Sequence, residues 1–97
     1  MTTLFFRAAA LEDVSEALGW YREKSSAAAD GFADELDAVV AAIERSPLKY
    51  PKVHRDVRRA LTRRFPYAIY FMTDGDRVTV LRVLHQARNP RLRPRGR

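Results

Sequence analysis

The chain has 97 residues, of which 46% are hydrophobic, which is enough for one small domain but not for two. It contains no cysteine, so a disulfide framework and thiol catalysis are excluded and a reducing cytoplasm is the expected location. No run of about 18 apolar residues is present, and the first residues lack the pattern of a secretory signal. We therefore expect neither a membrane span nor export.

The formal net charge of +6 is distributed unevenly along the chain. Residues 1–49 carry 5 basic and 9 acidic side chains, a net of −4, whereas residues 50–97 carry 13 basic and 3 acidic ones, a net of +10. Twelve of those 13 are arginine, whose planar guanidinium forms paired hydrogen bonds with carboxylate or phosphate. The second half is therefore predicted to contact nucleic acid or an acidic protein. The alternative is a solvated surface that only maintains solubility.

The first half of the chain is typical of one strand followed by two helices. The aromatic-rich residues 3–7 predict the strand. Apolar residues three and four positions apart predict a first helix over residues 9–25, with Glu12 and Asp13 in its first turn, where the helix dipole favours acidic groups. Its predicted apolar face consists of Leu11, Val14, Leu18 and Tyr21.

A second helix is predicted over residues 28–45, after a break at Ser25 and Ser26. Its predicted apolar face consists of Phe32, Leu36, Val39, Val40 and Ile43. The acidic residues on its other side are interpreted as a solvated face: Asp34, Glu35 and Asp37. The helix is expected to end at Ser46, because the residue before a proline is disfavoured in the helical conformation. So short a break predicts an antiparallel helical hairpin.

The second half predicts a loop and three strands. Residues 47–55 contain two prolines and are interpreted as an extended loop, and β-rich runs predict strands over residues 57–61, 67–73 and 77–85. The Asp74-Gly75-Asp76 segment between the last two is typical of a tight hairpin. Alternating residues of the middle strand are assigned to the core: Tyr67, Ile69 and Phe71. The last run is almost continuously apolar, which favours a central strand beside the first.

The order of these elements predicts an α+β domain. An N-terminal strand and an α-helical hairpin are followed by a three-stranded antiparallel meander, all forming one curved sheet. We assign residues 1–90 to this single domain. Residues 91–97 contain four arginines and little to bury, so they are expected to form a flexible basic tail.

Two segments resemble the ParE branch of the RelE/ParE toxin superfamily. Residues 63–71 (RRFPYAIYF) resemble the family segment R-x-F-P-Y-x-I-x-Y, and residues 80–90 (VLRVLHQARNP) resemble its closing strand, V-L-x-V-x-H-x-x-R-x-P. The second predicted helix and the proline-containing loop after it also resemble family members. The resemblance extends from residue 6 to residue 90.

The resemblance implies a toxin of a type II toxin–antitoxin system, neutralised by a cognate ParD-like antitoxin. ParE-like members are associated with poisoning DNA gyrase, which blocks replication, whereas RelE-like relatives cut mRNA in the ribosome. The predicted function is therefore ParE-like inhibition of gyrase, without a cofactor. The alternatives are a RelE-like, ribosome-dependent mRNA endonuclease and a non-toxic binding module of the same fold.

Cleavage of RNA needs a general base, a general acid and cations that stabilise the phosphate. His85, Arg88 and Arg64 are the candidate parts of such a site. In RNA-cleaving relatives, however, the strand equivalent to residues 67–70 commonly carries a functional arginine where Ala68 stands. No tyrosine or histidine follows Arg88 either. We therefore predict a protein that acts by binding, with no catalytic residue, and interpret His85 as a loop cap that bonds to the backbone.

Two sets of residues are candidates for binding. Those for the target are Arg63, Arg64, His85, Arg88, Arg91 and Arg93. An acidic, amphipathic antitoxin segment is expected along the helical hairpin and the sheet edge. The candidates for that contact are Trp20, Tyr21, Arg58, Arg59 and Tyr70. No metal site is predicted, because the two histidines are far apart in the sequence and no cysteine accompanies them.

Overall fold

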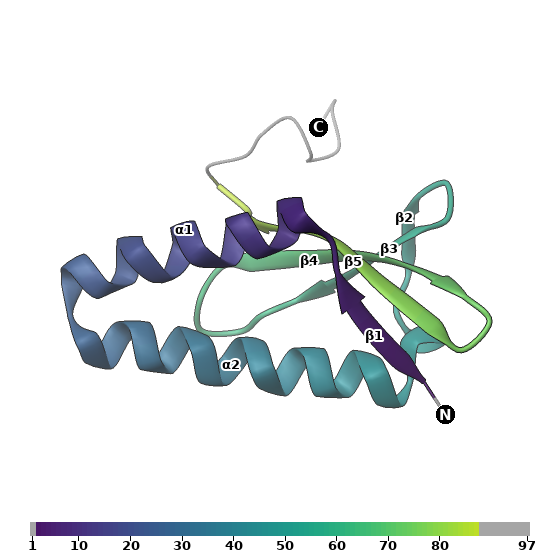
Figure 1. Ribbon diagram of the computed structural model, residues 1–97, viewed down its shortest axis with the longest axis horizontal. Helices are drawn as coiled ribbons and strands as arrows, with labels where there is room; N and C mark the ends of the chain where they lie inside the picture. The colour runs from purple at the N-terminus through teal and green to yellow at the C-terminus, as the bar shows by residue number, and fades with distance from the viewer. Residues whose placement is uncertain (1, 88–97) are drawn as a thin grey trace.

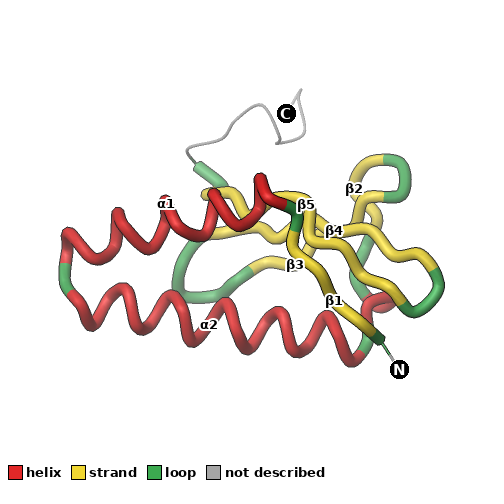
Figure 2. Tube along the Cα trace, in the orientation of Figure 1, coloured by secondary structure: helices red, strands yellow, loops and turns green. Residues whose placement is uncertain are grey.

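The computed structural model describes residues 2–87, which form a helical hairpin packed on one mixed sheet (Figures 1 and 2). In chain order the elements are β1 (Thr3–Phe6), α1 (Ala8–Lys24), α2 (Ser26–Arg45), the 3-10 turn η1 (Pro47–Lys49), β2 (Lys52–His54), β3 (Val57–Leu61), β4 (Tyr67–Asp74) and β5 (Arg77–His85). Neither helix within residues 2–87 has the length and apolarity needed to span a bilayer.

The sheet has the strand order β1-β5-β4-β3-β2. Strand β1 is parallel to β5, and all other neighbours are antiparallel. The predicted α+β class and the position of the last strand beside the first are therefore confirmed. Gly75 forms the β4–β5 turn with φ of +64°, a left-handed conformation that favours glycine and agrees with the prediction from the Asp-Gly pair.

The prediction of a continuous loop over residues 47–55 is wrong, because this segment contains η1 and the edge strand β2. Strand β2 pairs with β3 through Lys52–Arg58 and His54–Val57, with a register shift between these pairs. All three residues of β2 are exposed. A strand with no buried face has no reason to alternate polar and apolar residues, so the sequence carries no signal for it.

The predicted apolar face of α1 is confirmed for Val14, Leu18 and Tyr21, which are buried or packed against the core, and is wrong for Leu11. The buried residues of this helix are Ala10, Ala17 and Tyr21, whereas Leu11 is 57% exposed. Successive residues on a helix are separated by about 100° of rotation, so Leu11 lies to one side of the stripe that begins at Ala10. The small alanine side chains let α1 approach β5 closely. The expected position of Glu12 and Asp13 is also wrong, because α1 begins at Ala8 and its first turn holds no acidic residue.

Helix α2 begins directly after α1, at Ser26 rather than at residue 28. The hydroxyl of Ser25 accepts a hydrogen bond from the N–H of Ala28 at 3.0 Å and thereby caps the helix. The predicted apolar face is confirmed, since all of its members are buried or packed against the core: Phe32, Leu36, Val39, Val40 and Ile43.

The core lies between the helical hairpin and the central strands. The ring centroid of Phe32 is 5.3 Å from that of Tyr21 and 4.9 Å from that of Tyr67. Tyr67, Ile69 and Phe71 of β4 are all buried, so the predicted core face of this strand is confirmed. This aromatic cluster fixes the C-terminal end of α1 against the start of β4 and the end of β5.

Candidate functional site

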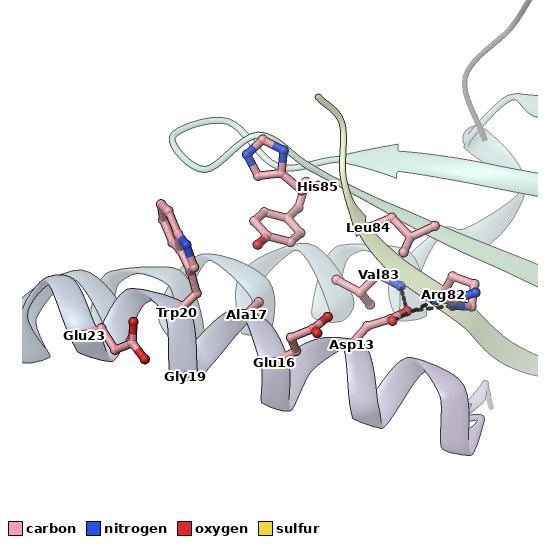
Figure 3. A pocket seen from close by; sticks show the side chains of 11 residues that line it. Asp13, Glu16, Ala17, Gly19, Trp20, Glu23, Arg82, Val83, Leu84 and His85 are labelled. Atoms are coloured by element: carbon pink, nitrogen blue, oxygen red, sulfur yellow. Dashed lines mark hydrogen bonds and ion pairs between the residues drawn. The ribbon is translucent and has the colours of Figure 1, made fainter. Parts of the chain in front are cut away.

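A pocket of about 520 Å³ opens between α1 and the C-terminal end of β5 (Figure 3). Its lining combines carboxylates of α1 with aromatic and apolar groups: Asp13, Glu16, Ala17, Gly19, Trp20, Glu23, Tyr67, Arg82, Val83, Leu84 and His85. Of the described residues in the lining, three thus carry a carboxylate and one a guanidinium. Within residues 2–87, a chain with a net positive charge therefore has a pocket with an excess of negative charge.

Asp13 joins α1 to β5 at one end of this pocket. Its carboxylate accepts hydrogen bonds from Nε of Arg82 at 2.8 Å, from Nη2 of Arg82 at 3.0 Å and from the N–H of Val83 at 2.9 Å. The hydrogen bond with Asp13 raises the pKa of Arg82, with further increases from the charges of Asp13, Glu12 and Glu16, while burial acts to lower it. Arginine is already charged near neutral pH, and the raised pKa extends the pH range of the ion pair further upward.

Sequence reasoning missed this contact. The one signal for it is Arg82 itself, a charged residue within an otherwise apolar run. Around Arg82 the register of β5 against β4 shifts, because Tyr70 pairs with Arg82 and Phe71 pairs with Val80. Such a bulge redirects the local side chains, and its position is not predictable from alternation alone.

His85 closes β5 and caps the turn after it. Its Nδ1 accepts a hydrogen bond from the N–H of Ala87 at 3.1 Å, which confirms the interpretation as a loop cap. The ring also packs edge-on against Tyr67, with centroids 5.2 Å apart. With Nδ1 as the acceptor, the proton of the neutral imidazole is on Nε2. The histidine is thus used to shape the turn and faces a pocket lined by carboxylates.

Arg63 and Arg64 lie in the exposed loop between β3 and β4. The carboxylate of Glu35 on α2 accepts hydrogen bonds from the backbone N–H of Arg63 and from that of Arg64, the latter at 3.0 and 3.1 Å. The interpretation of Glu35 as part of a solvated face is therefore wrong, whereas Asp34 and Asp37 are exposed. The Arg64 guanidinium lies 5.3 Å from the ring centroid of Phe65. Glu35 thus holds the loop backbone, while both arginine residues remain exposed.

Replacing Glu35 with alanine is expected to lower the free energy of unfolding by about 1–3 kcal/mol, because two backbone donors lose a charged acceptor. The matched control is Asp34→Ala, which removes an exposed carboxylate from the preceding position and is expected to change stability by less than about 0.5 kcal/mol. Urea denaturation followed by circular dichroism measures both. Equal effects of the two substitutions would show that the loop is not held by Glu35.

The candidates for antitoxin contact lie in different environments. Trp20 is 40% exposed at the rim of the pocket, with Nζ of Lys24 at 4.7 Å from its ring centroid, whereas Tyr21 is buried in the core. Nη1 of Arg58 donates to the carbonyls of Leu48 and Tyr50 at 3.3 and 2.6 Å. Its guanidinium is therefore engaged within the fold.

Arg59 and Tyr70 pair across β3 and β4 and are both half-buried. By strand alternation they point to the sheet face opposite Ala60 and Ile69, which belong to the core. Leu61 and Met72 share that outer face and are 47% and 37% exposed. This surface, which we call the outer sheet face, combines a cation with exposed apolar groups.

The remaining target candidates, Arg88, Arg91 and Arg93, lie outside the described residues. Arg63 and Arg64 precede β4 and His85 ends β5, so all three lie at the same end of the sheet, where Tyr67 pairs with His85. Within residues 2–87, no group of three or more histidine, cysteine, aspartate or glutamate side chains is arranged to hold a metal ion.

The fold is shared with a solved structure described as the chromosomal ParDE TA system from P. aeruginosa. The likeness has a TM-score of 0.77 at 18% identity and covers 88% of this chain and 96% of that chain. At this identity the likeness establishes the fold. No curated protein matches the chain.

The sequence also matches the family described as the ParE toxin of type II toxin-antitoxin system, parDE, over residues 4–90. This match spans nearly the whole chain. The protein therefore belongs to the ParE toxin family.

Proposed function

We propose that this chain is a toxin that inhibits DNA gyrase by binding, without cleaving RNA, and that an acidic antitoxin neutralises it in the cytoplasm. The observation that carries the proposal is the charge around His85. Among residues 2–87, the lining of the same pocket has three carboxylates, those of Asp13, Glu16 and Glu23, and one guanidinium, which is bonded to Asp13. These carboxylates would repel an RNA phosphate, whereas cleavage requires cations around it.

Strand β4, which pairs with the end of β5, carries no cationic side chain. Ala68, at the position where RNA-cleaving relatives commonly carry an arginine, is 2% exposed and pairs with Leu84. An alanine methyl group neither donates a hydrogen bond nor stabilises charge. His85 is engaged in the turn after β5 through its Nδ1, and the position of Ala68 supplies no cation, which supports a function based on binding.

The proposed contact with gyrase or its DNA uses the β3–β4 loop and the arginines that follow the described residues. Arg63 and Arg64 are exposed on a backbone that Glu35 holds in place. A fixed backbone lowers the entropy lost when the side chains bind an anionic surface. His85 would act here by shaping the adjacent turn, and Arg88, Arg91 and Arg93 would extend the same cationic surface.

The proposed antitoxin contact is the outer sheet face together with Trp20. Arg59 offers a cation and Tyr70 an amphipathic ring, and the exposed Leu61 and Met72 offer apolar area. An acidic, amphipathic segment that folds on binding matches this combination, with apolar anchors on the sheet and carboxylates on arginine. Arg58 donates hydrogen bonds to backbone carbonyls and Tyr21 is buried. These two candidates would therefore stabilise the fold beneath the contact surface and would not touch the antitoxin.

Expression of the protein alone in bacterial cells tests the proposal. Inhibition of gyrase predicts filamentous cells with DNA damage, and co-expression of the partner antitoxin is expected to restore growth. Rapid arrest of translation with cleaved mRNA would instead favour the RelE-like endonuclease. Normal growth at a verified protein level would favour a non-toxic binding module.

Truncation after Pro90 is expected to weaken toxicity while leaving the fold intact. The removed residues contain four arginines, and a cationic contact with DNA loses affinity with each phosphate partner removed. The measurement is the inducer concentration that halves growth, with circular dichroism as the check on folding. The matched control is Arg55→Gln, a single exposed cation in the β2–β3 turn. Full toxicity of a folded truncated chain would show that the removed residues do not contribute to binding the target.

A further inference from the structure

We propose that the pocket between α1 and the end of β5 is the docking site of the arginine-rich segment of this same chain, residues 88–97. The contact would be an intramolecular one, in which guanidinium groups of the segment pair with carboxylates of α1. It goes beyond the proposed function, because it concerns how the chain occupies its own surface and does not depend on which target the protein inhibits.

The pocket is suited to a segment that is both cationic and partly apolar. Ala17, Val83 and Leu84 form an apolar part of its lining. Glu16 and Glu23 of α1 also belong to the lining and are exposed. Within residues 2–87 neither of these glutamates has a cation at ion-pair distance. Asp13 differs, since Arg82 already pairs with it. Two negative charges of the lining are thus available to guanidinium groups.

The segment after the described residues has the complementary composition. Residues 88–97 contain five arginines, no acidic side chain and one leucine. Arginine pairs with carboxylates through two parallel hydrogen bonds and also stacks on aromatic faces. Trp20 at the pocket rim already has the Lys24 ammonium over its ring, so the pocket contains an aromatic surface that a cation approaches.

The chain leaves β5 beside the pocket, so the segment begins close to it. Strand β5 ends at His85, which is itself part of the lining. The next residues turn, with the N–H of Gln86 donating to the carbonyl of Pro66 at 2.8 Å and the N–H of Ala87 to Nδ1 of His85. Ten extended residues reach up to about 33 Å, whereas the helical rise between Asp13 and Glu23 is about 15 Å. The segment is therefore long enough to follow the pocket along α1.

Docking of this kind would compete with binding to anionic partners. The segment is tethered at the pocket, so its effective concentration there is on the order of millimolar, and it is mostly bound when the ion pairs, the stacking on Trp20 and the apolar contact together give a dissociation constant below that value. An anionic macromolecule would displace it by offering more charge than two glutamates. Salt would also release it, because the proposed pairs are exposed and are screened at high ionic strength.

Paramagnetic NMR on the full chain tests the proposal. The chain has no cysteine and one tryptophan, so Gly96→Cys gives a single position for a nitroxide label and keeps every arginine, and the Trp20 indole gives a single reporter signal. We expect the label to remove most of the intensity of the Trp20 indole signal at low salt, and high salt to restore it. A label at Asp74→Cys, at the end of β4 beside the first residue of β5, is the control and should leave that signal unchanged. An unaffected Trp20 signal with the label at position 96 would overturn the proposal.

Charge variants and a mixing experiment distinguish this contact from others. Glu16→Gln with Glu23→Gln is expected to restore the Trp20 signal, whereas the matched pair Asp37→Asn with Glu44→Gln, on exposed positions of α2, should not. If the Trp20 signal of the Glu16→Gln, Glu23→Gln variant stayed as weak as that of the parent chain, the assigned site would be wrong. In a mixture, one population of chains carries the nitroxide but no nitrogen-15, and the other carries nitrogen-15 but no nitroxide. The Trp20 signal of the second population should keep its full intensity, because the contact is within one chain. Loss in that mixture would show that a second copy supplies the segment and would overturn the intramolecular contact.

Discussion

Replacing Phe32 with alanine is expected to lower the free energy of unfolding by about 3–5 kcal/mol. Phe32 is fully buried, and its ring contacts those of Tyr21, Phe65 and Tyr67, so truncation leaves a cavity bounded by three aromatic rings. These rings come from α1, the β3–β4 loop and β4, and they cannot all move to fill the space. The total stability of a domain is about 5–15 kcal/mol, so the variant should be near its unfolding threshold.

The informative control for Phe32→Ala is Leu11→Ala. Periodicity in the sequence assigns Leu11 to the core, whereas in the structure it is 57% exposed. We expect its replacement to change stability by less than about 0.5 kcal/mol. Urea denaturation of both variants, followed by circular dichroism, measures the difference. Similar losses for the two variants would mean that α1 is rotated relative to the sheet from the orientation described above.

The second large effect is expected for Asp13→Ala, which should lower the free energy of unfolding by about 2–3 kcal/mol. The substitution removes the acceptor of both Arg82 nitrogens and of the Val83 N–H. Glu12→Ala is the matched control, because this neighbouring carboxylate is exposed and should change stability by less than about 0.5 kcal/mol. Amide exchange of Val83 should accelerate in Asp13→Ala alone.

A double-mutant cycle with Arg82→Ala separates the ion pair from the bond to the backbone. We expect Asp13→Ala to remain destabilising in the Arg82→Ala background, because the Val83 N–H still loses its acceptor. The raised pKa of Arg82 means that the pair is fully formed below the ordinary pKa of arginine and is lost only as pH rises through the higher folded value. The effect of Asp13→Ala should therefore not decrease between neutral and mildly alkaline pH. A decrease there would assign the stabilisation to another group.

Local patterns in the sequence predict most of the fold. The apolar spacing of α2, the serine break before it and the Asp-Gly turn before β5 each depend on residues close together in the chain, where propensity and periodicity act. The position of β5 beside β1 was also predicted, because an almost continuously apolar run indicates a central strand covered on both faces. The parallel orientation of this pair was not predicted. Strand β2 was not predicted either, since an exposed strand of three residues has no pattern.

The candidate site was less predictable, because its parts are distant in sequence. Asp13 and Val83 are 70 positions apart, and Glu35 is 28 positions from Arg63. From the sequence alone each acidic residue is equally consistent with a solvated helix face, and only the packing of the helices on the sheet distinguishes them. The acidic pocket beside His85 arises in the same way, from one face of α1 and the end of β5.

The most direct test of a toxin that binds and does not cleave uses purified components. Incubated with DNA gyrase and plasmid, the protein is predicted to reduce supercoiling and to accumulate cleaved DNA bound to gyrase, and incubated with ribosomes it is predicted to leave the mRNA intact. The His85→Ala variant, if folded, should retain some inhibition of gyrase. Cleavage of ribosome-bound mRNA by the purified protein, abolished in His85→Ala, would contradict the account.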